Sequence, residues 1–305
     1  MTTTLTGVMP VAPTVFTQDE ALDLDGQRRV VEFLIDAGSD AVCILANYSE
    51  QFSLDDRERL EVLETSLDAA AGRVPVTVTT SHFSTRIAAE RSLQAQERGA
   101  AVVMLMAPFF GTTVRCNDDD VVEYFKRVAD GLDVDIMIQD APMSATPLSV
   151  PLLARIAAAV PQVKYAKIEV ARAAQKIRDL AALAGEDLPG LFDGEESVTL
   201  LPDLDAGAVG TMCSALLPDL LGPAVRAHLD GDRENAAAAW EAALPLIQYE
   251  NRQCGLRAAK IVLAEGGVIA SDTCRAPFES VSAETRAGLL EHARRRDLLA
   301  LRWAK

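Results

Sequence analysis

The sequence predicts a (β/α)₈ barrel followed by a C-terminal helical domain. Three observations favour this fold: helix-period and strand-like segments alternate over about the first 220 residues, glycine often stands between them, and eight strand-like segments can be counted. Eight buried strands separated by helices fit a barrel better than a doubly wound parallel sheet, which stays open as the alternative. The predicted barrel covers residues 1–225, and the helical domain covers residues 226–305.

The predicted strands are short apolar segments. The run at 101–106 is apolar without interruption, which is typical of a strand that is buried on both faces. In chain order the predicted strands are 8–11, 41–45, 74–79, 101–106, 134–138, 163–169, 191–192 and 207–212.

Helical patterns separate these strands. The first helix has an apolar face of Val30, Val31 and Leu34 and is expected to end at Gly38. The Ser-Leu-Asp-Asp sequence at 53–56 is expected to be a capping box that opens the second helix. The later barrel helices are predicted at 84–98, 118–130, 151–159, 171–184 and 196–204, and those of the C-terminal domain at 224–249, 256–265 and 283–301.

Charge and composition limit the classes of partner. The formal net charge is −16, which argues against nucleic acid or an anionic membrane as a partner and favours a small molecule. The N-terminus lacks the pattern of a signal peptide, and no run approaches about 18 apolar residues. The five cysteines are scattered, as expected of reduced thiols in a cytoplasmic protein.

Sequence motifs for bound cofactors were not found. Neither a Gly-x-x-x-x-Gly-Lys-Ser/Thr loop nor a Gly-x-Gly-x-x-Gly fingerprint occurs. The three histidines, His82, His228 and His292, are too dispersed to indicate a zinc site. We therefore expect neither a metal nor an organic cofactor.

Lys167 is the candidate nucleophile. It is one of only six lysines and lies in the predicted strand 163–169, where alternation points Lys167 and Glu169 to the same face. A lysine whose charged form is disfavoured by burial can attack a ketone and form a Schiff base. The alternative is that Lys167 only forms an ion pair with Glu169.

Polar residues follow several predicted strands, and the active site of a barrel lies at these carboxyl ends. Backbone N–H groups around Asn47 and Tyr48 could hold a carboxylate. His82 could transfer a proton or bind a substrate hydroxyl, and it could equally be structural. The other candidates at strand ends are Gln139, Asp140, Asp193 and Glu195.

Several ordered segments resemble the dihydrodipicolinate synthase and N-acetylneuraminate lyase family over nearly the whole chain. The resemblance implies a (β/α)₈ barrel with a C-terminal helical domain, usually assembled as a homotetramer, and a Schiff-base lysine at Lys167. It also makes Cys213 a candidate for substrate binding. The segments that carry it are Pro13-Thr14-Val15-Phe16, 46–50, Pro108-Phe109-Phe110, Asp140-Ala141-Pro142, Lys167 and 207–213.

The sequence departs from the family pattern at three places. Most members have a Thr-Thr or Ser-Thr pair where Asn47-Tyr48 stands, a tyrosine where Gln139 stands, and Pro-Tyr-Tyr at 108–110. Phenylalanine cannot relay a proton, and glutamine is not an acid or base at neutral pH. Aldol chemistry that depends on a tyrosine relay is therefore less favoured.

Within the family, the segments 43–54, 167–169, 193–196, 250–253 and 266–271 are most similar to members that dehydrate 2-keto-3-deoxy-L-arabonate. This similarity predicts a hydro-lyase that forms 2-oxoglutarate semialdehyde from a small 2-keto sugar acid through Lys167. The alternatives are a retro-aldolase that releases pyruvate and a non-catalytic keto-acid sensor. Candidates for proton transfer are Glu169, Tyr48 and His82, and those for substrate binding are Asn47, Tyr48, Gln139, Asp140, Asp193, Glu195 and Cys213.

Overall fold

The computed structural model describes residues 4–109 and 116–305; Phe110, named above, lies outside the described residues. Eight strands belong to one sheet, in the order β1-β8-β7-β6-β5-β4-β3-β2. Parallel pairing of consecutive strands, with helices between them in the chain, confirms the predicted (β/α)₈ barrel.

The chain forms two compact units. The first is mainly Thr77–Glu195 and Thr199–Met212, and the second is mainly Gly7–Val76 and Cys213–Lys305. The domain boundary near residue 225 stays a prediction.

The strands of the first unit are short and almost entirely buried, as expected when both faces of a parallel sheet are covered. Each strand pairs with the next one in the chain. The strands are β3 (Val76–Thr79), β4 (Val102–Met106), β5 (Asp135–Asp140), β6 (Val163–Ile168), β7 (Gly190–Asp193) and β8 (Gly210–Thr211).

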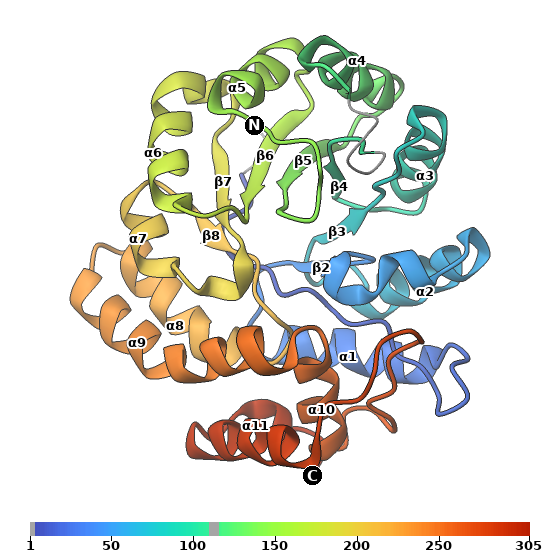
Figure 1. The fold of residues 1–305 in the computed structure, drawn as a ribbon, viewed down its shortest axis with the longest axis vertical. Helices are drawn as coiled ribbons and strands as arrows, with labels where there is room; N and C mark the ends of the chain where they lie inside the picture. Colours follow the sequence, from blue (N-terminus) through green and yellow to red (C-terminus); the bar gives the residue numbers. More distant parts are fainter. Residues whose placement is uncertain (1–3, 110–115) are drawn as a thin grey trace. The chain divides into compact units, whose positions relative to one another are not determined.

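The helices of the first unit lie outside its strands (Figure 1). α4 opens with a capping box between Asn117 and Asp120, and Ser149 caps α5, because its hydroxyl accepts from the Leu152 N–H at 3.2 Å. The helices are α3 (Thr85–Glu97), α4 (Asp118–Ala129), α5 (Val150–Ala159), α6 (Ala173–Ala184) and α7 (Leu200–Asp205).

The second unit contains two short strands and most of the C-terminal helices. Val11 forms parallel bridges with both Cys43 and Ser214. The elements are β1 (Gly7–Val8), β2 (Val42–Ile44), α1 (Leu24–Asp36), α2 (Asp56–Ala70), α8 (Pro218–Leu229), α9 (Arg233–Tyr249), α10 (Arg257–Glu265) and α11 (Ala283–Arg295).

Several predicted helix boundaries are wrong, two of them in the second unit for clear local reasons. The capping box of α2 is made by Asp55 and Glu58, because Ser53 ends a 3₁₀ turn and is not followed directly by the helix. The helix predicted at 224–249 is two helices, because Gly231 adopts a φ of 86° and Asp232 then caps α9.

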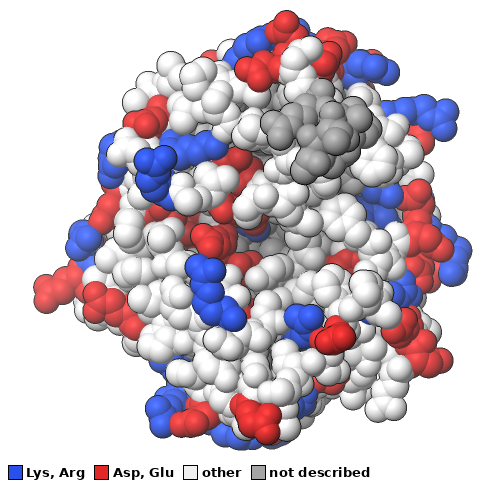
Figure 2. Space-filling model, viewed as in Figure 1, with Lys and Arg blue, Asp and Glu red and all other residues white. Residues whose placement is uncertain are grey.

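Charged side chains of both signs are interspersed over the face shown in Figure 2. None of the helices within residues 4–109 and 116–305 has the length and hydropathy that a membrane span requires.

Candidate active site

Lys167 lies on β6, and the residue is only 2% exposed. Its neighbours in the sheet register are Gln139 on β5 and Phe192 on β7. The Lys167 Nζ forms an ion pair with the carboxylate of Glu169, and both side chains are largely buried. The alternation of the strand therefore brings the two residues together, as predicted.

Glu169 is held on more than one side. The side-chain amide of Gln139 donates to Glu169 Oε2 at 3.1 Å, and the Glu169 N–H donates to the Asp140 carbonyl at 3.1 Å. Gly194 packs against the same carboxylate side chain, because a Cβ at this position would lie 2.3 Å from Glu169 Cγ. Gly194 therefore leaves the space that Glu169 fills, a role that the sequence analysis missed.

The side-chain oxygen of Gln139 is an unsatisfied acceptor among the described residues. This atom, Oε1, is buried and has no hydrogen-bond partner there. A buried acceptor without a partner costs about 1–3 kcal/mol, so such an atom marks a place where a ligand hydroxyl or water belongs.

Asp140 points to the opposite face of β5 from Gln139. Its carboxylate lies 2.5 Å from Lys176 Nζ on α6, and Lys176 also donates to the Leu148 carbonyl. Burial raises the pKa of Asp140, while the hydrogen bond from Lys176 opposes that shift. The carboxylate of Asp140, a predicted substrate-binding residue, joins β5 to α6.

Asp193 ends β7 and is buried between polar groups. It accepts a hydrogen bond from the Thr211 hydroxyl and forms another with Asp203 of α7. Burial raises the pKa of Asp203, and two carboxyl groups that share a hydrogen bond need one proton between them. Asp193 thus links β7 to β8 and α7.

We expect Asp203→Asn to flatten the pH dependence of stability. When folding raises the pKa of an acid, its protonated form stabilises the folded state. This stabilisation is complete below the pKa of the unfolded state, about 3.9 for Asp, and is lost as the pH rises through the pKa of the folded state. The asparagine amide donates at any pH, so the variant should keep at least the wild-type free energy of unfolding at pH 7. Urea unfolding at pH values from 4 to 8 tests this expectation, with Asp205→Asn at an exposed position as the control. A free energy of unfolding that depends on pH as steeply in Asp203→Asn as in the wild type would contradict it.

The turn after β7 has an unusual backbone. Glu195, Glu196 and Ser197 have successive φ values of 43°, 54° and 71°. Left-handed residues other than glycine cost about 1–3 kcal/mol each and gather at functional sites. The helix predicted from residue 196 begins only at Leu200, because these three residues cannot join it.

His82 follows β3 at the start of α3. Its Nδ1 accepts from the Ser84 N–H at 2.9 Å, and its ring lies 4.4 Å from that of Phe83. The Tyr124 hydroxyl donates to the His82 carbonyl at 3.0 Å, and burial raises the pKa of Tyr124. These contacts fix the His82 ring beside the first turn of α3.

Three predicted site residues belong to the second unit. Asn47 and Tyr48 form a 3₁₀ turn directly after β2, and Asn47 Oδ1 accepts from the Gln51 amide at 2.6 Å. Cys213 is fully buried, and its carbonyl accepts from the Val11 N–H at 2.8 Å. The structure thus groups Lys167, Glu169 and Gln139 within the first unit and places Asn47, Tyr48 and Cys213 in the second.

Two thiols of the second unit are shifted away from the reactive thiolate form. Burial raises the pKa of the Cys254 thiol to about 11 and that of Cys274 to about 12, so both stay protonated near neutral pH. Residues 4–109 and 116–305 contain no group of three or more side chains arranged to bind a metal ion.

The fold and the cluster of Lys167, Glu169 and Gln139 define a (β/α)₈ barrel protein with a buried lysine and carboxylate at the end of the sixth strand. The model of the dihydrodipicolinate synthetase family matches residues 4–295, and the chain belongs to this family.

Similar proteins cover nearly the full length of the chain. L-2-keto-3-deoxyarabonate dehydratase of Azospirillum brasilense is 51% identical over 98% of this chain and 96% of the relative. The 4-hydroxy-tetrahydrodipicolinate synthase of Sorangium cellulosum is 31% identical over 95% of this chain and 96% of the relative. The crystal structure of dihydrodipicolinate synthase from Rhodopseudomonas palustris matches with a TM-score of 0.87 and 26% identity, covering 95% of this chain and 97% of the other.

Proposed function

We propose that the chain is a hydro-lyase that converts 2-keto-3-deoxy-L-arabonate to 2-oxoglutarate semialdehyde through a Schiff base at Lys167. The observation that carries this proposal is the buried Lys167–Glu169 pair, with Gln139 bonded to the carboxylate. The 51% identity to an L-2-keto-3-deoxyarabonate dehydratase supports the same substrate.

The reaction begins at the substrate ketone. The neutral Lys167 amine attacks C2, and loss of water from the carbinolamine gives an iminium ion. Glu169, whose carboxylate already contacts Nζ, takes up the proton that the amine loses on attack and returns it to the carbinolamine hydroxyl, which leaves as water, so Glu169 is ionised again when the iminium has formed. The iminium then withdraws electrons from C3.

Dehydration uses the acidity that the iminium creates. Removal of a C3 proton, which we assign to Glu169, forms an enamine, and the enamine expels the C4 hydroxyl as water. Loss of a C5 proton and reprotonation at C3 then give an enol at C4 and C5 that becomes the aldehyde. Hydrolysis releases 2-oxoglutarate semialdehyde and restores Lys167, so the net change is the loss of one water.

Other residues bind the substrate in this proposal. Gln139 Oε1 is a buried acceptor without a described partner, which suits a substrate hydroxyl. We assign the C1 carboxylate to the backbone N–H groups around Asn47 and Tyr48, as the family resemblance implies. Tyr48 and His82 remain the candidates for protonating the leaving hydroxyl.

Product identification tests the reaction. We expect a panel of 2-keto-3-deoxy sugar acids to yield semialdehyde from the L-arabonate derivative, with no pyruvate. Release of pyruvate would instead identify a retro-aldolase, which cleaves C3–C4 after the same iminium. Binding without any product would identify a keto-acid sensor.

We extend the proposal to the cellular setting. The enzyme acts in pentose catabolism in the cytoplasm as a homotetramer, as the family resemblance implies. The five free cysteines support a reducing compartment. Light scattering at micromolar concentration tests the tetramer, and a monomer mass would contradict it.

A further inference from the structure

Gln139 ends in an amide whose two polar atoms have different surroundings. Its Nε2 donates to Glu169 Oε2 at 3.1 Å, whereas its Oε1 has no hydrogen-bond partner among the described residues. The residue is only 1% exposed. Because a carboxylate accepts hydrogen bonds and does not donate them, the contact with Glu169 fixes which end of the amide is the donor. The buried Oε1 therefore needs a donor from elsewhere.

The neighbours of Gln139 in the sheet do not supply this donor. In the strand register, Gln139 lies between Met106 on β4 and Lys167 on β6. The thioether of Met106 carries no N–H or O–H, and the amine of Lys167 forms its ion pair with Glu169. All four residues belong to the first unit. An unsatisfied buried acceptor next to the reacting lysine indicates that a hydroxyl of the substrate binds there.

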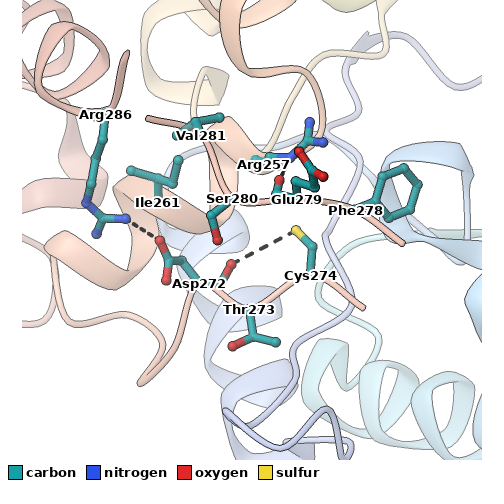
Figure 3. Close-up of a pocket in the computed structure, with 10 residues that line it drawn as sticks. All are labelled: Arg257, Ile261, Asp272, Thr273, Cys274, Phe278, Glu279, Ser280, Val281 and Arg286. Carbon is teal, nitrogen blue, oxygen red and sulfur yellow. Dashed lines mark hydrogen bonds and ion pairs between the residues drawn. The ribbon is translucent and has the colours of Figure 1, made fainter. Parts of the chain in front are cut away.

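The cavity of the second unit does not show the same need for a ligand. It has a volume of about 270 Å³ and is lined by α10, α11 and the loop before α11 (Figure 3). Arg286 pairs there with Asp272, and Arg257 donates to the Glu279 carbonyl. Within residues 4–109 and 116–305, none of the buried side-chain N and O atoms without a partner belongs to the lining of this cavity. The unsatisfied Oε1 therefore favours Gln139 as the place where a ligand binds.

The substrate has a hydroxyl at C4 and another at C5, and they differ in what they need. The C4 oxygen departs as water and has to gain a proton, which an acceptor such as Oε1 does not supply. The C5 oxygen stays in the product and becomes the aldehyde oxygen. Its O–H donates in the substrate and again in the enol, so an acceptor suits C5 at both stages.

The order of the side chains matches the order of the substrate atoms. Glu169 contacts Lys167 through Oε1 and Gln139 through Oε2, so it lies between the residue that binds C2 and the unsatisfied amide. We propose that Gln139 is the specificity-determining residue for the C5 hydroxyl, which donates to its Oε1. This inference rests on the proposed function. Gln139 exchanges no proton itself, because an amide is neither an acid nor a base at neutral pH.

A substrate analogue without the C5 hydroxyl tests the proposal. 4-Hydroxy-2-oxopentanoate, with the same arrangement at C4, forms the same iminium and gives 2-oxopent-3-enoate by loss of the C4 hydroxyl as water. With the wild type, we expect kcat/KM for 2-keto-3-deoxy-L-arabonate to exceed that for the analogue by about 10- to 100-fold, because the analogue leaves Oε1 without a donor.

Gln139→Met removes the acceptor while it keeps a side chain of similar length. In this variant, we expect the two values of kcat/KM to differ by less than about threefold. Loss of the hydrogen bond to Glu169 lowers both values alike, so the ratio of the two values isolates the contact with C5. A wild-type ratio in Gln139→Met would assign the residue to the positioning of Glu169 and overturn the proposal.

Two further variants support this comparison. Gln139→Asn keeps the amide but shortens the side chain, and its ratio should lie between those of the wild type and Gln139→Met. If Gln139→Met does not fold, a wild-type ratio in Gln139→Asn overturns the proposal. Met106→Leu is the matched control, because Met106 is the buried neighbour of Gln139 in the register, and it should keep the wild-type ratio.

Failure of the proposed function gives a different result. A wild type that dehydrates both compounds with equal kcat/KM would overturn the role of Gln139 and leave the hydro-lyase intact. Release of pyruvate from 2-keto-3-deoxy-L-arabonate, or the absence of a borohydride-reducible adduct at Lys167 with either compound, would overturn the hydro-lyase itself.

Discussion

Replacing Lys167 by alanine is expected to lower turnover of 2-keto-3-deoxy-L-arabonate by at least about 10⁴-fold, because no described neighbour supplies a second amine. Lys167 is the described lysine that lies next to Glu169 and Gln139, whereas Lys176 and Lys260 are engaged with Asp140 and Glu50. The loss should appear in kcat, since covalent attack is the step that is removed.

Borohydride reduction separates this role from a structural one. With substrate or pyruvate present, the wild type should gain a stable adduct on the peptide that contains Lys167, and Lys167→Ala should gain none. Lys164→Ala, on the same strand but partly exposed, is the matched control and should keep both the adduct and turnover. An adduct on another lysine, or activity above about a tenth of wild type in Lys167→Ala, would contradict the assignment.

Local patterns predicted the fold well because most strands contain short apolar runs that alternate with helix-period segments along the chain. They also predicted the contact between Lys167 and Glu169, since residues two apart on a strand share a face. The same rule separates Gln139 from Asp140, although both are candidates at the end of one strand. Only Gln139 shares the side of the sheet that Lys167 occupies.

Contacts between distant parts of the chain could not be predicted from local patterns. The Lys176–Asp140 pair joins residues 36 apart, and the Lys260–Glu50 pair joins residues 210 apart. Neither leaves a periodic signal in the sequence. The left-handed backbone at 195–197 was also missed, because the acidic residues there are equally typical of a helix N-terminus.

The chemistry of the cluster formed by Lys167, Glu169 and Gln139 differs from a tyrosine relay in one respect that can be tested. The described side-chain partners of Glu169 are Lys167, whose nitrogen becomes part of the iminium, and the amide of Gln139, so neither can serve as the base once the Schiff base has formed. If Glu169 moves the C3 proton, its loss must slow the steps after iminium formation more than iminium formation itself.

Glu169→Gln is therefore expected to lower kcat by about 10²- to 10⁴-fold, while the pyruvate adduct at Lys167 still forms to its full extent, although more slowly. Glutamine keeps the shape of the side chain beside Gly194 and can still accept from Gln139, but it cannot take up a proton. Removing the carboxylate also removes a charge that favours the ammonium form of Lys167, so the amine should remain able to attack.

If the Lys167–Glu169 ion pair is purely structural, adduct formation and kcat should not respond differently to its loss. In that case Glu169→Gln would lower the melting temperature and reduce adduct formation and kcat together. Lys176→Met, which removes the buried pair on the other face of β5, shows the size of such an effect. We expect Lys176→Met to be destabilised by about 3 kcal/mol with kcat changed by less than about tenfold. A Glu169→Gln enzyme that behaves in the same way would assign Glu169 to stability and leave the C3 base to Tyr48 or His82.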